Sequence, residues 1–443
     1  MVRAWPGPEN NILPMKIAYL VPGTGGAFYC GNCHRDRMFV TIMKNNQGTD
    51  VVAIPLYLMP NRDDFGDGFE EEVFFGAISL YFKEHVPLLR NMPAFLEKML
   101  DSRPMLRFAA RMSGSTTPEG LEQTTIDMIT GVGPALLKET EKLMDFLSRD
   151  GKPDIIHLSN ALLAGLAYNI RKISDIPVVC SLQNEDDWIN EMKEPFGSEA
   201  WRLIGKSAEV IERFVSSSEY YKQFIVAKTG IDPAKIEVVH PVDKPEFRVP
   251  ERNEDEKPSV GYFSRLSVAN GLDKMIGAFL IMKEKMPDLQ LHLCGGYTAS
   301  DKSFVKKQIA RINDAGHAKS LHLHNSFSGA EKESFFRSID LLSVPVRKPD
   351  AWGQYLIESI SAGVPVVQPA TGASPEIVEM TGGGITYSDD TETGLAEAML
   401  QLLADRPARM VMRNSGISSL DSELSPDMMK ERIKALYKNV LTK

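Results

Sequence analysis

The sequence predicts an α/β protein with two consecutive domains, each a doubly wound parallel sheet with helices on both faces. Two observations carry this prediction. Short apolar runs that end in polar residues, Gly or Pro alternate with helical patterns along the chain, which is typical of parallel sheets. The alternation pauses at residues 250–258 and then restarts, which marks a boundary between two domains. A chain of 443 residues is too long for one ordinary domain and suits two of this kind.

The composition narrows the class of protein. Apolar residues (43%) and charged residues (25%) stand at the levels of a soluble globular protein. A net charge of −9 argues against binding nucleic acid through general attraction to phosphates. Four cysteines are too few for a disulfide framework, and no run of about 18 apolar residues could cross a membrane. Residues 1–14 lack the apolar core of a signal peptide, so we expect a disordered extension and a cytoplasmic protein.

The first domain is expected to span residues 15–250. Its buried strands are expected at 16–22, 51–57, 154–160, 177–183 and 213–218, with a helix at 161–173. Residues 58–150 interrupt this order with an acidic, glycine-containing loop and a mostly helical stretch. We interpret this stretch as a helical insertion in which a variable substrate pocket could be built.

Within the insertion, residues 86–112 are apolar and net basic. A helical hairpin that packs on the first domain is the favoured interpretation. The alternative is a peripheral contact with an anionic membrane surface, at the inner face of the membrane.

The second domain is expected to span residues 251–424. A charged linker at 250–258, with Pro at each end, leads into its first strand. Its strands are expected at 259–263, 289–294, 320–325, 340–346, 364–369 and 383–388. His292, His322 and His324 alternate with apolar residues in two of these strands and are expected to be structural. Residues 428–441 have the apolar spacing of an amphipathic helix.

The segment 349–379 is the most informative for function. Residues 354–362 can form a helix, and Gly363 fits the left-handed residue that ends it. The main-chain amides from Gly353 to Leu356 then form a helix N-terminus, which is a ready site for a phosphate.

Three side chains near this segment suit a nucleoside diphosphate. Asp350 precedes the helix, and its carboxylate can reach the cleft between the domains. Glu358 lies about two turns along the helix, where it can accept hydrogen bonds from vicinal hydroxyls such as those of a ribose. Arg265 follows the strand at 259–263, and its guanidinium can clamp a diphosphate with two parallel hydrogen bonds.

These residues resemble the motifs of a known family. The family pattern has Arg-Leu and then Lys-Gly after the first strand of the second domain, and two acidic residues around a Gly-aromatic-Gly turn. Here the matching positions are Arg265-Leu266, Asn270-Gly271, and Asp350 with Glu358. Residues 372–379 and 382–403 are similar to further family segments. The chain therefore resembles glycosyltransferase family 4 (glycosyl transferases group 1), whose GT-B fold has two Rossmann-like domains facing a central cleft.

The resemblance implies a metal-independent, retaining transfer of a sugar from a UDP-, ADP- or GDP-sugar to an acceptor hydroxyl, with no cofactor. It implies that Arg265 stabilises the leaving diphosphate, that Glu358 holds the ribose in the same pocket, and that Asp350 faces the sugar hydroxyls. Further donor-binding positions carried over are Gly25, Gly26, Asn270, Gly353, Gln354, Tyr355 and Leu356. The first domain would select the acceptor, a saccharide, lipid or small molecule, and the last helix, 425–443, would pack back on that domain.

The absence of any Asp-x-Asp in the chain agrees with a fold that neutralises diphosphate without a divalent ion. Three positions depart from the family pattern. Asn270 stands where the family has a phosphate-binding Lys, a loss that could cost on the order of 10²–10³ in rate unless Lys274 or another residue compensates. Asp350 replaces a Glu, and Gln183 stands where many members have a His. These departures leave open a nucleotide-sugar-binding or regulatory protein with weakened turnover.

Residues 22–36, PGTGGAFYCGNCHRD, follow the first strand and are expected at its carboxyl end, facing the cleft. Gly25 and Gly26 allow close backbone approach to a ligand. No Lys-Ser/Thr follows, so the loop is not a P-loop of the NTPase kind. In the fold that the chain resembles, this loop covers the donor phosphates and the transferred sugar.

Cys30, Cys33 and His34 leave several chemistries open. Covalent haem attachment is disfavoured because it normally needs export. A zinc or cluster site with Cys180, a reversible disulfide, and thiols that pack or line the acceptor pocket remain. The zinc or cluster site and the reversible disulfide lead to a further hypothesis for the whole chain. Beside a glycosyltransferase and a binding or regulatory protein, it could be a Cys-x-x-Cys metal or redox protein. His157, near the end of a strand, is expected to be either a structural histidine or a cleft residue.

Overall fold

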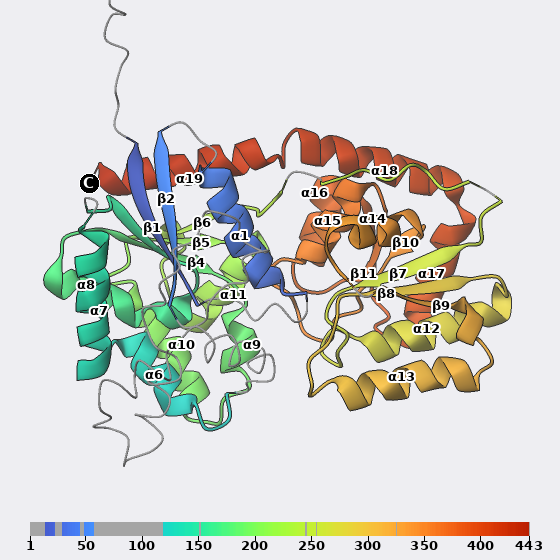
Figure 1. Ribbon diagram of the computed structural model, residues 1–443, viewed down its shortest axis with the longest axis horizontal. Coiled ribbons are helices and arrows are strands. Elements are labelled where there is room, and N and C mark those ends of the chain that lie inside the picture. The colour runs from blue at the N-terminus through green and yellow to red at the C-terminus, as the bar shows by residue number, and fades with distance from the viewer. Residues whose placement is uncertain are drawn as a thin grey trace, which may run out of the picture.

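The structure is a computed structural model, and it describes residues 14–22, 29–44, 48–56, 118–149, 152–243, 246–253, 255–324 and 326–442. The described part contains two six-stranded sheets, with strand orders β2-β1-β3-β4-β5-β6 and β12-β11-β10-β7-β8-β9. All neighbouring strands are parallel. The two sheets stand side by side, each surrounded by its helices (Figure 1). The predicted α/β fold with two doubly wound parallel sheets is confirmed.

The first half of the molecule is built on the first sheet. Its strands are β1 (Met15–Val21), β2 (Thr49–Pro55), β3 (Ile155–Leu158), β4 (Val178–Leu182), β5 (Arg213–Ser216) and β6 (Ile236–Val238). Its helices are α1 (Gly31–Lys44), α6 (Glu122–Thr130), α7 (Pro134–Leu147), η4 (Ala161–Leu163), α8 (Gly165–Ile173), α9 (Glu185–Ile189), α10 (Phe196–Ser207), α11 (Glu219–Thr229) and η5 (Pro233–Lys235). Strand β6 was not predicted, because its three residues are too few to show a pattern.

The predicted helix at 161–173 is divided into η4 and α8. Asn160 caps η4 with its side chain, which accepts a hydrogen bond from the amide of Leu162. The longer helix begins at Gly165, where the backbone of α6 approaches so closely that a Cβ atom would lie 2.1 Å from the Met128 carbonyl oxygen. The lack of a side chain at position 165 therefore permits the close approach of α6 and α8.

The second half is built on the second sheet. Its strands are β7 (Ser259–Phe263), β8 (Gln290–Cys294), β9 (Leu321–His324), β10 (Leu341–Leu342), β11 (Val366–Pro369) and β12 (Gly384–Tyr387). Its helices are α12 (Leu272–Lys285), α13 (Lys302–Asp314), η6 (Ala318–Ser320), α14 (Gly329–Arg337), α15 (Gln354–Ala362), α16 (Ser374–Thr381), α17 (Glu392–Ala404) and α18 (Arg406–Asp421). Strand β10 is shorter than the predicted 340–346, and Pro345, which cannot donate to a ladder, lies beyond its end.

His292, His322 and His324 lie together on β8 and β9. The rings of His292 and His322 stack with centroids 4.4 Å apart, and His292 Nδ1 lies 3.1 Å from His324 Nε2. This edge of the second sheet is thus held by contacts among the three imidazoles.

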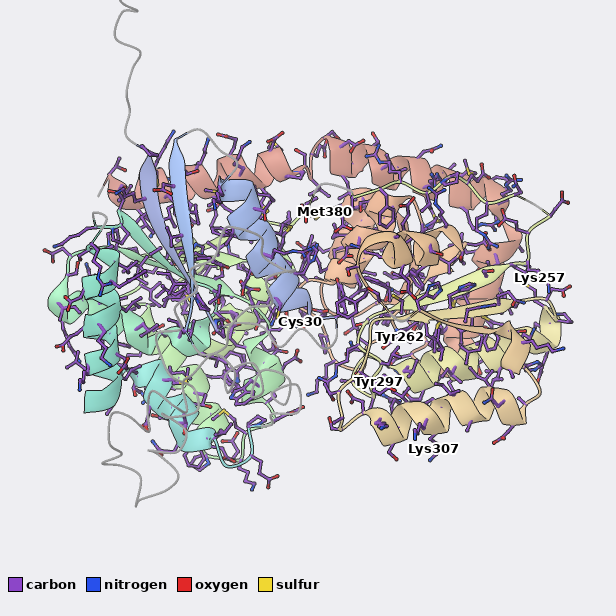
Figure 2. All side chains as sticks on the ribbon, in the orientation of Figure 1. Cys30, Lys257, Tyr262, Tyr297, Lys307 and Met380 are labelled. Atoms are coloured by element: carbon purple, nitrogen blue, oxygen red, sulfur yellow. The ribbon has the colours of Figure 1, made fainter. Side chains whose placement is uncertain are left out.

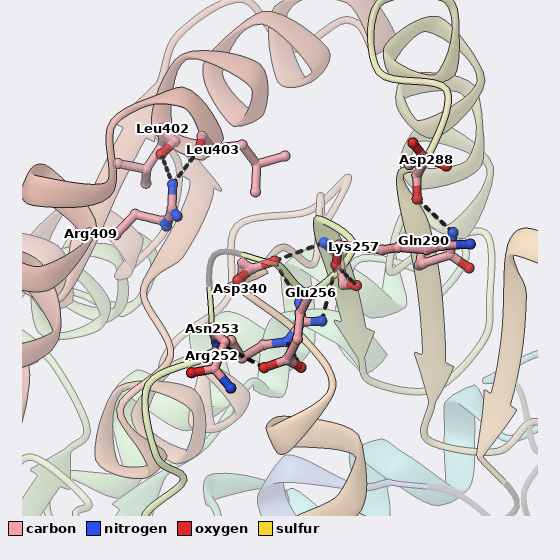
Figure 3. Close-up of polar contacts among 11 residues, drawn as sticks. Arg252, Asn253, Glu256, Lys257, Asp288, Gln290, Asp340, Leu402, Leu403 and Arg409 are labelled. Atoms are coloured by element: carbon pink, nitrogen blue, oxygen red, sulfur yellow. Dashed lines mark hydrogen bonds and ion pairs between the residues drawn. The ribbon is translucent and has the colours of Figure 1, made fainter.

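The charged segment 250–258 forms neither helix nor strand in its described residues and lies against the second sheet. Arg252 Nη1 donates to Asp340 Oδ2 at 2.6 Å, and the amide of Ser259 donates to the same oxygen at 2.8 Å (Figure 3). This carboxylate therefore fixes the point where the chain enters β7.

The last helix, α19 (Pro426–Leu441), continues along the molecule from α18 and lies over the first sheet (Figure 1). Its apolar residues enter the core around β1; they are Met429, Ile433, Leu436, Tyr437 and Val440. The Tyr437 hydroxyl lies 2.6 Å from His157 Nδ1, and Ser181 Oγ lies 2.9 Å from His157 Nε2. His157 is fully buried, so it joins β3 and β4 to the last helix.

We expect His157 to make stability depend on pH. Burial lowers the pKa of His157 to about 3, whereas an unfolded chain titrates its histidines near pH 6.5. Only the unfolded chain takes up this proton between those values. The contribution of His157 is therefore complete above about pH 6.5 and is lost toward pH 3, at up to about 1.4 kcal/mol per pH unit.

Urea unfolding of the wild type and of His157→Gln, at about pH 7 and about pH 5, measures this dependence. The wild type should lose more stability than the variant between the two values. An equal loss in both proteins would contradict the assignment of this pH dependence to His157.

Two predicted features of the first half cannot be compared with the structure. Residues 1–13 and most of the predicted insertion, including 86–112, lie outside the described residues. Among the helices that the structure describes, none is both long enough and apolar enough to cross a membrane.

Candidate active site

A cavity of about 540 Å³ lies between the two halves of the molecule. One wall follows the carboxyl ends of β3 and β4 and includes Asn184, Asp187 and Trp188. The other wall follows the carboxyl ends of β7, β8 and β10 and includes Arg265 and Asp350. Loops at the carboxyl ends of parallel strands are the usual place for small ligands in such sheets, so this cavity is the candidate site.

Arg265 lies just beyond β7 and lines the cavity. Its Nε donates to Asp301 Oδ2 at 2.9 Å, and its Nη2 donates to Thr298 Oγ1 at 3.0 Å. Burial alone would raise the pKa of Asp301, but hydrogen bonds from Thr298 and Arg265 hold it below its ordinary value. A diphosphate that binds this guanidinium must therefore compete with an ionised carboxylate.

The cations near the predicted phosphate position differ from the family pattern. Asn270 lines the cavity and donates its Nδ2 to Ser264 Oγ at 2.6 Å. Lys274 pairs with Asp390 at 2.5 Å and does not line the cavity. Lys348 does line it, and its Nζ lies 2.8 Å from Glu191 Oε1 of the first half. Within the described residues, Arg265 and Lys348 are the cations of the cavity wall.

Asp350 is held at the cavity by contacts from both halves. Its Oδ1 accepts hydrogen bonds from Asn184 Nδ2 at 3.0 Å and from the amide of Trp352 at 3.1 Å. Asn184 adopts a left-handed conformation with φ 57°, a strain that is common at functional sites. Burial, Asp186 and Asp350 together raise the pKa of the nearby Asp187 to about 6. Asp187 therefore takes up a proton at a higher pH than an ordinary aspartate does.

Glu358 is buried within α15 and paired with a cation. Its Oε2 lies 2.6 Å from Lys332 Nζ, and its Oε1 accepts a hydrogen bond from the Tyr29 hydroxyl at 2.6 Å. Burial alone would raise the pKa of Glu358, but Lys332, His34 and Tyr29 hold it below its ordinary value. The carboxylate is thus kept ionised, as an acceptor for hydroxyl groups.

Glu358 does not share a cavity with Arg265, which corrects the expectation of one common pocket. It lines a separate cavity of about 20 Å³ with His34, Lys332 and Gln354. Tyr29 lies against Glu358, since its hydroxyl donates to Glu358 Oε1. The amide of Tyr29 donates to the Gly295 carbonyl at 2.8 Å, and its ring lies edge-on to Phe263 with centroids 4.9 Å apart. A residue of the first half therefore fills space at the carboxyl end of β7.

The start of α15 carries buried polar atoms that lack partners. Gln354 is 1% exposed, and within the described residues neither its Oε1 nor its Nε2 has a hydrogen-bond partner; the same is true of the Tyr355 hydroxyl. Buried polar atoms are almost always bonded, so these atoms indicate a place for a ligand or water. Gly353 precedes the helix, and Gly363 ends it with φ 89°, as predicted. The amide of Leu356 already donates to the Gly353 carbonyl at 2.8 Å. Contrary to the expectation from the sequence, this amide is therefore not open to a phosphate.

Gln183 belongs to a buried network rather than presenting an open amide to the cavity. Its Nε2 donates to Asp36 Oδ1 at 2.9 Å and to the Ser159 carbonyl at 2.7 Å, and its Oε1 accepts from Arg35 Nε at 3.2 Å. Arg35 also donates to the Trp352 carbonyl at 3.1 Å, so this network joins the two halves. A hydroxyl that binds Gln183 would have to replace one of these partners.

Cys30 and Cys33 stand at the start of α1, at the junction of the two halves where Figure 2 labels Cys30. The neighbouring His34 has its Nε2 3.7 Å from Asp243 Oδ2 and 4.0 Å from Glu358 Oε1. Cys180 is buried in β4, where its thiol donates to the Ser181 carbonyl. Across the residues that the structure describes, no three His, Cys, Asp or Glu side chains form a metal-binding group. Gly25 and Gly26 lie outside the described residues.

Three side chains of this region were not predicted from the sequence: Tyr29, Arg35 and Lys332. Tyr29 and Arg35 lie in the stretch 22–36, whose glycines and Cys-x-x-Cys spacing predicted a functional loop. That spacing could have directed attention to these two residues. Lys332 gives no local signal, since only folding brings α14 beside Glu358.

Two protein family models match the chain. The model described as Glycosyl transferases group 1 matches residues 243–419, and the model described as Glycosyltransferase Family 4 matches residues 130–242. Among curated proteins, the GDP-mannose-dependent monoacylated alpha-(1-6)-phosphatidylinositol monomannoside mannosyltransferase of Corynebacterium glutamicum is 24% identical over 54% of this chain and 64% of its own length. The D-inositol 3-phosphate glycosyltransferase of Mycobacterium tuberculosis is 25% identical over 48% of this chain and 46% of its own length. The matches thus span about half to two thirds of these relatives.

Solved structures share the whole architecture. Anabaena HepE, crystallised in complex with UDP and glucose, has a TM-score of 0.67 at 15% identity and covers 96% of this chain and 99% of its own. Sucrose-phosphate synthase from Thermosynechococcus elongatus has a TM-score of 0.69 at 14% identity, with 97% and 99% covered. These likenesses show the fold. Because the two family models together run from residue 130 to residue 419, more than half of the sequence, the chain belongs to the group 1, family 4 glycosyltransferases of the GT-B fold.

Proposed function

We propose that this chain transfers a sugar from a nucleotide-diphosphate sugar to an acceptor hydroxyl, with retention at the anomeric carbon and without a metal ion. The observation that carries the proposal is the cavity between the two halves, where Arg265 and Lys348 face polar residues of the first half. The relatives, a mannosyltransferase and a glycosyltransferase, support the class of reaction, and the UDP and glucose bound to HepE support the class of donor.

In this proposal, each half contributes a different part of the reaction. Arg265 takes up the negative charge that develops on the leaving diphosphate, and Lys348 supplies a second cation where position 270 lacks one. Glu358 accepts the ribose hydroxyls once the Tyr29 hydroxyl leaves it. Asp350 orients the transferred sugar, and the wall around Asn184 and Trp188 receives a hydroxylated acceptor, which polar groups beside an aromatic ring suit.

A thermal-shift panel of UDP, ADP, GDP and their sugar conjugates tests the donor. A nucleotide diphosphate at about 100 times its dissociation constant should stabilise the chain by about 2.7 kcal/mol. Transfer to a trial acceptor should continue in the presence of a chelator, and the anomeric configuration of the product, read by NMR, should match that of the donor. Inversion of the anomeric configuration would contradict the proposed mechanism, and the lack of any stabilising nucleotide would contradict the proposed function.

A further inference from the structure

Cys30 and Cys33 make a thiol contact that sugar transfer does not use. Cys30 directly precedes α1, and Cys33 lies in its first turn. Their Sγ atoms are 2.6 Å apart, and the amide nitrogen of Cys33 lies 3.4 Å from Cys30 Sγ. Since a disulfide bond is about 2.05 Å long, the two sulfur atoms need little movement to become bonded.

The surroundings favour the reactive form of Cys30. A thiolate at the start of a helix is stabilised by the main-chain amides of the first turn. The hydrogen bond from Cys33 lowers the pKa of Cys30, and this effect exceeds that of burial, which acts in the opposite direction. Cys180 and Cys294 differ, because burial raises the pKa of Cys180 and brings that of Cys294 to about 12. Cys30 thus differs from Cys180 and Cys294, whose thiols are held in the protonated, less reactive form.

The pair is also placed to act on the candidate donor site. Tyr29, the residue before Cys30, donates its hydroxyl to Glu358 at 2.6 Å and is tied to Gly295 through its amide. A nucleoside that is to reach Glu358 must first displace this side chain. A bond between Cys30 and Cys33 would fix the backbone of Cys30 to the first turn of α1 and so restrict the movement of Tyr29.

We propose that Cys30 and Cys33 are a redox-active thiol pair, and that their oxidation to an intrachain disulfide holds Tyr29 over Glu358 and weakens nucleotide binding. The second part rests on the proposed function. The oxidant is a small-molecule disulfide such as glutathione disulfide. The Cys30 thiolate attacks one of its sulfur atoms and releases one thiolate; Cys33, after losing its proton to solvent, attacks Cys30 Sγ and releases the second. Two electrons pass to the small disulfide, which becomes two thiols.

The test uses the full chain in glutathione buffers of graded potential, followed by alkylation under denaturing conditions and mass measurement. Oxidation should protect two cysteines from alkylation, and peptide analysis should place the bond between Cys30 and Cys33. The variant Cys180→Ala should keep this behaviour, whereas Cys30→Ser should lose it. If all four thiols stayed alkylatable under oxidising conditions, or if the bond joined other cysteines, the redox pair would be refuted.

Titration of both redox forms with UDP tests the coupling. The oxidised form should bind UDP about fivefold or more weakly than the reduced form, in the range of ordinary allosteric couplings, and Tyr29→Ala should remove the difference. Equal affinity in the two forms would overturn the coupling. If neither form bound any nucleotide, the proposed function and the coupling would both fail. The number of cysteines protected from alkylation would still test the redox pair.

Discussion

Replacing Glu358 with Ala should destabilise the chain and also abolish tight nucleotide binding. Glu358 and Lys332 are each 8% exposed, and their charged atoms lie 2.6 Å apart. Removal of one member of a buried ion pair typically costs about 3–5 kcal/mol, because the remaining charge stays buried without its partner. Glu246, with its Oε1 3.4 Å from the same ammonium group, should moderate this loss. The free energy of unfolding in urea measures the first effect, and calorimetric titration with UDP measures the second.

A double variant separates stability from binding at this position. Glu358→Gln together with Lys332→Gln leaves no buried charge unpaired, so it should regain most of the lost stability. It should still bind the nucleotide about 10–100-fold more weakly, since hydrogen bonds to a charged acceptor are worth about 1.5–3 kcal/mol. Wild-type affinity in the double variant would show that Glu358 does not hold the ribose.

The same ion pair gives a pH dependence whose direction follows from the two pKa shifts. The pKa of Glu358 is lowered, so the contribution of its charge is present above the ordinary carboxyl pKa and is lost as the pH falls through the lowered value. Glu358 and Glu246 raise the pKa of Lys332 against the effect of burial, so its contribution is lost only as the pH rises through that raised value.

Replacing Arg265 with Ala should remove most of the affinity for nucleoside diphosphates. Charge-assisted hydrogen bonds of the kind that a guanidinium makes to a diphosphate are worth about 1.5–3 kcal/mol, or about 10–100-fold in affinity. Binding of the nucleoside without phosphates should change much less, because Arg265 lies at the cavity wall rather than beside Glu358. Titration of the wild type and of Arg265→Ala with UDP and with uridine measures the contrast.

Asp301→Asn is the matched control for Arg265. This substitution keeps the hydrogen-bonding shape around Thr298 but removes the carboxylate 2.8 Å from the guanidinium. It should strengthen binding of the diphosphate, because the ligand no longer competes with a fixed negative charge. If Asp301→Asn weakened UDP binding as much as Arg265→Ala, the proposed contact between Arg265 and the diphosphate would be contradicted. Arg265 and Asp301 would then affect binding only through the local structure.

Several elements could be predicted from the sequence because their signals are local. The strand at 259–263 and the helix at 354–362 form with the predicted bounds. Gly363 ends that helix in a left-handed conformation, which its lack of a Cβ atom permits. The two sheets could be predicted from the alternation of apolar runs and helical patterns. A parallel strand is buried on both faces, so nearly all of its residues are apolar.

The sequence by itself determined the two parallel sheets, the loops at their carboxyl ends and the acidic and basic residues in those loops. Only the tertiary structure decided which of these residues meet. The hydrogen bond from Tyr29 to Glu358 joins positions 329 residues apart, and the partner Lys332 comes from a different helix. Such contacts depend on how two separately patterned halves are placed against each other, and a local hydrophobic period carries no record of that placement.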